Sequence, residues 1–191
     1  TGRAVMEQGG FHTVSLEDTL QLAADYSEEY LHTHFGALES QRLEYLFRRN
    51  LQELEMVVRE LWRELQQASF EPAYFELQFG KDGQMPAIAI PNEGIQAELR
   101  GFVDRVDLWH RGESTYFRVV DYKTGKEASR NVTDVQSVFT RKDIGALHAN
   151  YYLQAMLYSL IIRHNKQHNP QQLPVSPALL FIQHSQRAGY D

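Results

Sequence analysis

The sequence contains no cysteine, and this absence removes several classes of protein from consideration. A disulfide framework, a zinc site with cysteine ligands, an iron–sulfur cluster and a thiol nucleophile all require that residue. The chain also lacks any apolar run approaching the ~20 residues that a membrane-spanning helix needs. No signal peptide is recognisable at its start. We therefore expect a cytoplasmic protein that makes no contact with a membrane.

The residues that are present suffice for one globular domain with a core. Of 191 residues, 42% are hydrophobic and 12% aromatic, a composition that argues against disorder. The net charge of −6 is unevenly distributed, because residues 1–98 hold 7 basic and 17 acidic side chains whereas residues 99–191 hold 12 and 8. A basic half on an acidic protein is consistent with one face that meets a polyanion. Chance together with a heavily charged surface helix is the alternative explanation of the same numbers.

The first 70 residues are predicted to be helical. Ser15 and Ser40 each provide an N-cap, and Asp18 completes a capping box with Ser15. After Ser40, apolar residues recur at spacings of three and four, which predicts a long amphipathic helix whose apolar stripe packs into the core. The stripe consists of Leu43, Leu46, Phe47, Leu51, Leu54, Val57, Val58, Leu61, Trp62 and Leu65.

Strands and one further helix are predicted from residue 74 onward. Segments rich in aromatic and β-branched residues, separated by Gly- and Asp-containing turns, indicate the strands. The expected strands cover residues 74–79, 88–90, 97–109, 115–122 and 178–183, with a helix over 147–164 after an irregular polar stretch. This order of elements predicts an α/β (α+β) fold with a helical N-terminal part.

Two of these strands carry the residues that point to chemistry. A turn near Gly112 makes them a hairpin, and Asp104 and Asp121 lie eight and nine positions from that turn, so antiparallel pairing brings both carboxylates to one end of the sheet. Lys123, two residues after Asp121, shares its face. Neighbouring carboxylates imply a counter-cation, and oxygen ligands favour Mg²⁺ or Mn²⁺. The set predicts phosphodiester hydrolysis, although such residues at strand ends also form ordinary salt bridges.

The downstream helix adds Gln154 and Tyr158, which are four residues apart and so lie on one helix face. Three segments thus follow one another in order: Gly101–Asp107, Asp121–Thr124 and Gln154–Tyr158. They match the G-x-x-D-R-x-D, D-Y-K-[ST] and Q-x-x-x-Y motifs, so the sequence resembles the RecB-like family of the PD-(D/E)XK nuclease superfamily. An F-x-P…E-L-x-F-G segment over residues 70–80 makes it most similar to the C-terminal nuclease domain of AddB-type helicase–nuclease subunits.

The resemblance implies a restriction-endonuclease-like core, with a central mixed β-sheet flanked by helices. It also implies a site in which Asp104, Asp121 and the backbone carbonyl of Tyr122 hold Mg²⁺ (or Mn²⁺). Lys123 is then the catalytic lysine, and Gln154 and Tyr158 complete the set of catalytic residues.

The implied function is a metal-dependent DNA nuclease domain of an AddAB- or RecBCD-like helicase–exonuclease in double-strand-break repair. Its partners are then single- or double-stranded DNA ends and an AddA-like helicase–nuclease subunit. On this interpretation residues 1–70 are a helical part of the same domain, residues 71–191 are the nuclease core, and the chain is a C-terminal fragment of a longer protein.

Some features of the family pattern are missing. The family usually carries an upstream histidine ligand, and His32 and His34 lack the acidic residue expected at the matching spacing. Cysteines for the iron–sulfur cluster of many AddB proteins are also absent. A non-catalytic nuclease-fold module that binds DNA or another protein chain therefore stays open as an alternative, as does a stand-alone PD-(D/E)XK nuclease.

Three secondary expectations accompany this interpretation. Arg105 and Asp107 are predicted to form a structural ion pair, and Glu76 is a weaker candidate for the site. The stretch between Lys126 and Leu147 is longer than in compact family members and is interpreted as a DNA-facing loop or a plain insertion. Its neighbourhood contains the basic residues Arg130, Arg141, Lys142 and His148.

Overall fold

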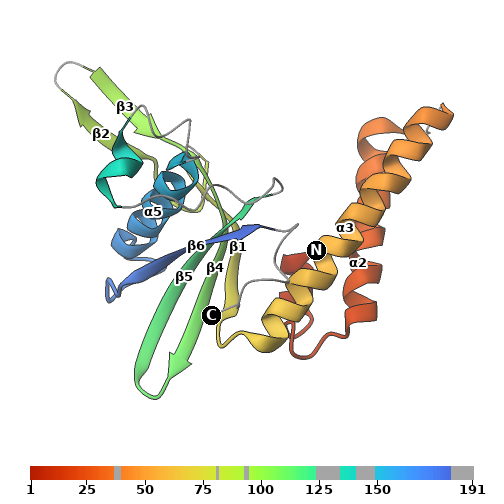
Figure 1. Ribbon diagram of the computed structural model, residues 1–191, viewed down its shortest axis with the longest axis horizontal. Helices are drawn as coiled ribbons and strands as arrows, with labels where there is room; N and C mark the ends of the chain where they lie inside the picture. Colours follow the sequence, from red (N-terminus) through yellow and green to blue (C-terminus); the bar gives the residue numbers. More distant parts are fainter. Residues whose placement is uncertain (37–39, 81, 93–94, 124–133, 141–148, 182–191) are drawn as a thin grey trace. The chain divides into compact units, whose positions relative to one another are not determined.

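The computed structural model describes residues 1–36, 40–80, 82–92, 95–123, 134–140 and 149–181 (Figure 1). The chain divides into two compact units, with the boundary between Ser69 and Phe70. The first unit is helical and the second contains the β-sheets, in the order predicted from the sequence. No helix within these described ranges is both long and apolar enough to cross a membrane.

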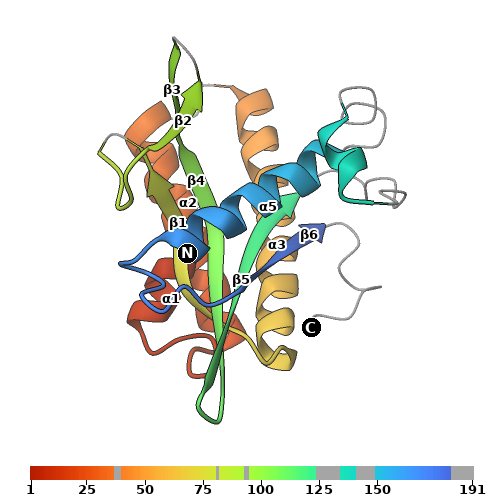
Figure 2. The same ribbon diagram turned by 90° about the vertical axis from the view of Figure 1, so that its left-hand side faces the viewer.

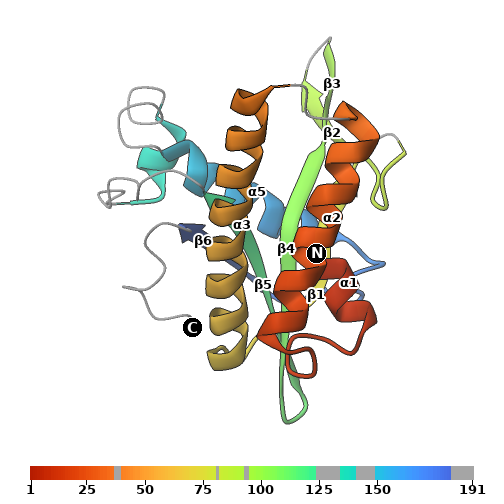
Figure 3. The same ribbon diagram turned by 90° about the vertical axis from the view of Figure 1, so that its right-hand side faces the viewer.

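The first unit consists of three helices, α1 (Gly2–Glu7), α2 (Leu16–Phe35) and α3 (Gln41–Gln67). The two predicted N-caps are confirmed, because Ser15 Oγ accepts from the Asp18 N–H at 3.1 Å and Ser40 Oγ accepts from the Leu43 N–H at 3.3 Å. The helices α2 and α3 run antiparallel and contact each other (Figure 3). Helix α1 lies in the segment predicted to be helical, but the sequence did not mark its bounds, because it is short and its start at Thr1 has no side-chain cap.

The apolar stripe of α3 is only partly a core, which corrects the prediction. Val58 and Leu65 near the end of the helix are buried, whereas Leu43 and Leu46 near its start are 49% and 40% exposed. Helical periodicity reports that a face is apolar but not whether another element covers it. The helix also has i,i+3 and i,i+4 ion pairs, each of which stabilises it by about 0.2–0.5 kcal/mol. The pairs are Glu44–Arg48, Arg49–Glu53, Glu55–Arg59 and Glu60–Arg63.

The second unit is built on a mixed four-stranded sheet, as predicted. Its strand order is β1-β4-β5-β6, with antiparallel pairing up to β5 and parallel pairing between β5 and β6. The helix α5 connects the two parallel strands and packs against both of them (Figure 2). The elements are β1 (Glu71–Phe79), β4 (Gly101–Arg111), β5 (Ser114–Lys123), the 3₁₀ helix η1 (Gln136–Phe139), α5 (Ala149–His164) and β6 (Val175–Phe181).

The single strand predicted over residues 97–109 is wrong, because the chain changes sheets at Arg100. Its first part, β3 (Ile95–Leu99), pairs with β2 (Ile88–Asn92) in a separate two-stranded sheet, and its second part, β4, joins the main sheet. Gly101 stands at this change of sheet, where a Cβ atom would lie 3.0 Å from the Phe79 ring. A larger residue there would require the Phe79 ring to move by a few tenths of an ångström.

The core of the second unit lies between the main sheet and α5. Apolar side chains of β1, β4 and β5 meet Ile161 and Ile162 of the helix. The cluster fixes α5 against β5, and thereby sets the distance between polar groups at the ends of these two elements. Its fully enclosed members from the sheet include Val103, Val106 and Val119.

Candidate active site

The central hairpin places Asp104 and Asp121 at the same end of the sheet, as the spacing predicts. The register pairs Arg105 with Val120, so the next rung holds the two aspartates. There, Asp104 Oδ2 accepts a hydrogen bond from the Tyr122 N–H at 2.8 Å. A carboxylate thus satisfies this backbone donor at the end of the β4–β5 ladder, and Asp104 is anchored beside Asp121.

Asp121 is a buried carboxylate that forms an ion pair with Lys123. Its side chain is 2% exposed, and Lys123 Nζ lies 2.5 Å from its Oδ2 atom. Burial raises the pKa of Asp121, the adjacent ammonium group of Lys123 lowers it, and the negative charge of Asp104 raises it further. Burial and Asp104 outweigh Lys123, so the environment disfavours the ionised carboxylate. An additional cation at this position would restore the balance.

Lys123 is held from a second side by α5. Its Nζ atom donates to Gln154 Oε1 at 3.0 Å, and Gln154 Nε2 donates to the Tyr158 hydroxyl oxygen at 2.9 Å. The Tyr158 ring packs edge-to-face on Phe79 of β1. A continuous polar chain therefore runs from Asp121 through Lys123 and Gln154 to Tyr158. The structure brings all these candidates together, while their catalytic roles stay predictions.

Tyr151 also belongs to this group, and the sequence analysis missed it. Its ring lies 4.5 Å from Lys123 Nζ, within the range of a cation–π contact. Tyr151, Gln154 and Tyr158 are spaced by three and four residues, so their helical spacing was a signal that could have identified the first of them.

The predicted ion pair between Arg105 and Asp107 is confirmed. Arg105 Nε lies 2.8 Å from Asp107 Oδ1, and both side chains are fully buried. Arg118, which the sequence analysis did not single out, donates to Asp107 Oδ2 from Nε at 3.0 Å and from Nη2 at 2.9 Å. The missing signal was the register, which places Arg118 directly opposite Asp107. Arg105 in turn donates to the Tyr122 hydroxyl at 3.1 Å.

The chemistry of the donor set fits a hard divalent cation. Two carboxylates and a backbone carbonyl provide oxygen ligands, which Mg²⁺ prefers, and Mg²⁺ commonly binds through only one or two carboxylates. Asp121 Oδ2 is buried and has no hydrogen bond of good geometry, although Lys123 is nearby. Within the described part of the chain, no group of three or more His, Asp or Glu side chains is arranged to hold a metal.

The other candidates do not join the carboxylates into such a group. His34 lies in α2 of the first unit, where its ring stacks on Tyr30 and its Nδ1 atom contacts the Tyr30 carbonyl; His32 is exposed in the same helix. Glu76 is exposed on β1 with a positive φ of 50°. The basic residues of the predicted loop, Arg130, Arg141, Lys142 and His148, lie outside the described residues, whereas its residues 134–140 are described and include η1.

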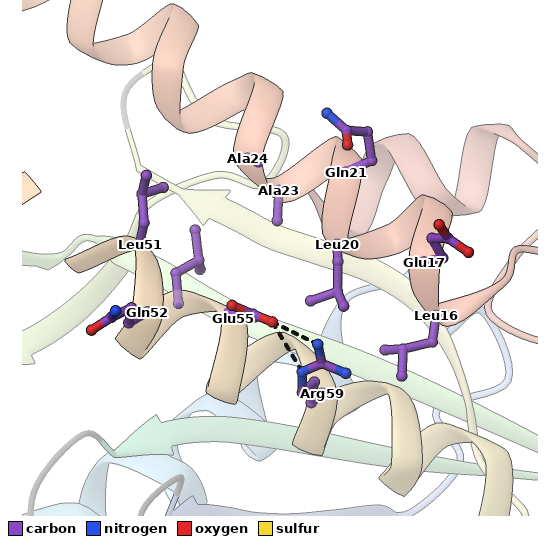
Figure 4. A pocket seen from close by; sticks show the side chains of 11 residues that line it. Leu16, Glu17, Leu20, Gln21, Ala23, Ala24, Leu51, Gln52, Glu55 and Arg59 are labelled. Carbon is purple, nitrogen blue, oxygen red and sulfur yellow. Dashed lines mark hydrogen bonds and ion pairs between the residues drawn. The ribbon is translucent and has the colours of Figure 1, made fainter. Parts of the chain in front are cut away.

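An open groove of about 600 Å³ lies in the first unit, between α2 and α3 (Figure 4). Leu16, Leu20 and Leu51 provide much of its apolar lining. The Glu55–Arg59 ion pair crosses its edge. The groove contains none of the candidate catalytic residues, so its volume does not locate the site.

The mixed sheet, its crossover helix and the carboxylate–lysine cluster define an α/β domain with a PD-(D/E)XK arrangement of residues. A family model described as "PD-(D/E)XK nuclease superfamily" matches residues 5–190. The chain belongs to this superfamily, which confirms the resemblance drawn from its motifs.

Among characterised proteins, the chain is similar to the B subunits of ATP-dependent helicase/deoxyribonucleases from several bacteria. It is 37% identical over 90 residues to the protein of Clostridioides difficile, which covers 47% of the chain and 8% of that protein. It is 28% identical over 144 residues to the protein of Clostridium acetobutylicum, and this match covers 75% of the chain and 11% of that protein. It is 33% identical over 121 residues to the protein of Thermoanaerobacter sp., and this match covers 63% of the chain and 10% of that protein. The chain thus spans about a tenth of these relatives' length.

Proposed function

We propose that the chain is a metal-dependent nuclease domain that hydrolyses phosphodiester bonds in DNA. The observation that carries the proposal is the polar chain from Asp121 through Lys123 and Gln154 to Tyr158, beside Asp104, in a domain of a nuclease superfamily. An isolated structural salt bridge would not need a glutamine and a tyrosine from another element to orient its lysine. Catalytic groups, in contrast, need such support.

In this proposal Asp104, Asp121 and the Tyr122 carbonyl hold Mg²⁺ or Mn²⁺. When bound, the cation supplies charge stabilisation to the phosphate and favours ionisation of the attacking water. Lys123 positions that water and offsets the negative charge that develops on the phosphate. Gln154 keeps the ammonium group of Lys123 in place. Tyr158 accepts from Gln154 and directs its own hydroxyl proton to a phosphate oxygen.

The similarity to the B subunits of helicase/deoxyribonucleases supports a role in processing DNA ends in the cytoplasm, together with an AddA-like helicase–nuclease subunit. The contacts with DNA are then mostly to the backbone, with little reading of sequence. The family model spans both units, from residue 5 to residue 190, which supports treating the helical segment as part of the nuclease domain.

The test is cleavage of end-labelled linear single- and double-stranded DNA with Mg²⁺ or Mn²⁺. We compare the wild type with Asp121→Ala and with a matched control, Asp25→Ala, which removes an exposed carboxylate of α2. Cleavage by the wild type and the control, but not by Asp121→Ala, supports the proposal. Equal cleavage by all three proteins would refute it.

A second candidate is a non-catalytic module of the nuclease fold. It is favoured by the absence, among the described residues, of a third His, Asp or Glu arranged with the two aspartates. A module of this kind would bind DNA with or without the divalent cation and would cleave nothing. Cleavage measured in the presence of the divalent cation, on DNA that the chain is first shown to bind, therefore separates the two candidates.

A further inference from the structure

Tyr122 connects the two sides of the central hairpin. Its backbone N–H donates to Asp104 Oδ2 at 2.8 Å, and its hydroxyl oxygen accepts from Arg105 Nη1 at 3.1 Å. The neighbouring Asp121 and Lys123 have side chains on the opposite face of β5, because side chains alternate along a strand. Tyr122 is therefore bound at both its backbone and its side-chain end, in the middle of the candidate catalytic segment.

The guanidinium group that holds the Tyr122 hydroxyl is itself rigid. Arg105 is fully buried and donates to Asp107 through Nη2 at 3.1 Å, in addition to the close Nε–Oδ1 ion pair. Asp107 is fixed in turn by two hydrogen bonds from Arg118, whose guanidinium lies 4.5 Å from the centre of the Phe70 ring. Planar guanidinium groups in such paired geometry have little freedom to move.

Burying these charges costs desolvation free energy, so a stabilising role alone does not explain why they are buried. The desolvation of each ion costs several kcal/mol, and apolar replacements of similar volume are often equally stable. A buried arginine whose donors reach both an aspartate and the hydroxyl of a site residue is, however, suited to fixing a position. Displacements of about 1 Å at a catalytic group can reduce a rate about 100-fold.

We propose that Arg105 is a positioning residue that acts through the Tyr122 hydroxyl. By holding this side chain, it fixes the backbone of residues 121–123, and with it the Asp121 carboxylate, the Tyr122 carbonyl and the Lys123 ammonium group. Arg105 does not touch the reacting atoms. Its effect on catalysis rests on the proposed nuclease function, whereas its effect on the backbone does not.

The test is Tyr122→Phe, which removes the hydroxyl group that accepts from Arg105 Nη1 and keeps the aromatic ring. Arg105 variants risk losing the fold because Asp107 would lose a buried partner. Tyr116→Phe is the matched control, since it removes a hydroxyl from the same strand; Tyr116 is 44% exposed and its ring packs on Trp109. Two quantities are measured for each protein: the hydrogen-exchange rate of the residue 122 amide by NMR, and kcat and KM for DNA cleavage.

We expect Tyr122→Phe to speed exchange of the residue 122 amide about 10-fold and to lower kcat about 10-fold, in the range found for groups that orient metal ligands. KM for DNA is unchanged, and Tyr116→Phe matches the wild type in both measurements. An unchanged exchange rate would overturn the positioning role, whatever the activity. Faster exchange with unchanged kcat would also overturn it.

Failure of the nuclease function is seen separately. If the wild type cleaves no DNA, the proposed function fails, and the exchange rate alone decides whether Arg105 fixes the Tyr122 backbone. An unchanged rate then refutes the proposal, and a rate raised in Tyr122→Phe but not in Tyr116→Phe supports its structural part.

Discussion

Binding of a divalent cation should raise the melting temperature of the wild-type chain and leave that of Asp121→Asn unchanged. The substitution preserves the shape of the side chain and removes the buried carboxylate charge that a cation would offset. At a cation concentration of 100 times Kd, linkage gives about 2.7 kcal/mol of stabilisation. For a domain of this size, 1 kcal/mol shifts the melting temperature by about 2–4 °C, so the expected rise is about 5–11 °C.

The assay is thermal unfolding of protein stripped with EDTA and titrated with Mg²⁺ or Mn²⁺ at constant ionic strength. Asp25→Asn is the control, because its carboxylate lies on the exposed surface of α2. Without metal, we expect Asp121→Asn to be at least as stable as the wild type, since burial and Asp104 favour the uncharged form of this group. A shift of equal size in Asp121→Asn would refute the reasoning, because the cation would then bind elsewhere.

Three further predictions concern other groups of the second unit. Gln154→Leu removes the acceptor of Lys123 and should lower the cleavage rate about 10–100-fold with the fold retained; an unchanged rate would contradict this. Asp107→Asn deprives Arg105 and Arg118 of their buried carboxylate and should lower the free energy of unfolding, measured in urea, by about 3–5 kcal/mol. A decrease of less than about 1 kcal/mol would show that this network does not stabilise the fold. Burial lowers the pKa of His168 below 6.5, so the stability due to its neutral ring is present above pH 6.5 and is lost as the pH falls. In His168→Gln, urea midpoints should decline less between pH 6.5 and about pH 5, and an identical decline would exclude this role.

The sequence was sufficient to predict the parts of the site that depend on local periodicity. Side chains alternate along strands, so Asp121 and Lys123 had to share a face, and the turn near Gly112 fixed which residues meet across the hairpin. Helical spacing likewise placed Gln154 and Tyr158 together. These relations hold over a few residues, so they could be read without knowing how distant segments pack.

The features that were missed depend on contacts between distant segments. The strand over residues 97–109 breaks at Arg100 because its two halves pair with different strands. A pattern of extended residues predicts a strand but does not specify the strand with which it pairs. Arg118 could not be distinguished from an ordinary exposed strand residue in the sequence. Its guanidinium group can be buried only because Asp107 lies opposite it, and this pairing depends on the register of two strands. The exposed start of α3 shows the same limit, since the apolar character of Leu43 and Leu46 does not reveal whether a neighbour covers them.

If the aspartates hold a metal while Lys123 takes part in the chemistry, a Lys123 variant must separate metal binding from cleavage. Cleavage of end-labelled DNA and the cation-dependent rise in melting temperature are measured for the wild type, Lys123→Met and Lys166→Met, the last of which alters an exposed lysine after α5. We expect Lys123→Met to keep the rise in melting temperature and to lose cleavage, whereas Lys166→Met keeps both. Cleavage by Lys123→Met at the wild-type rate would contradict this expectation.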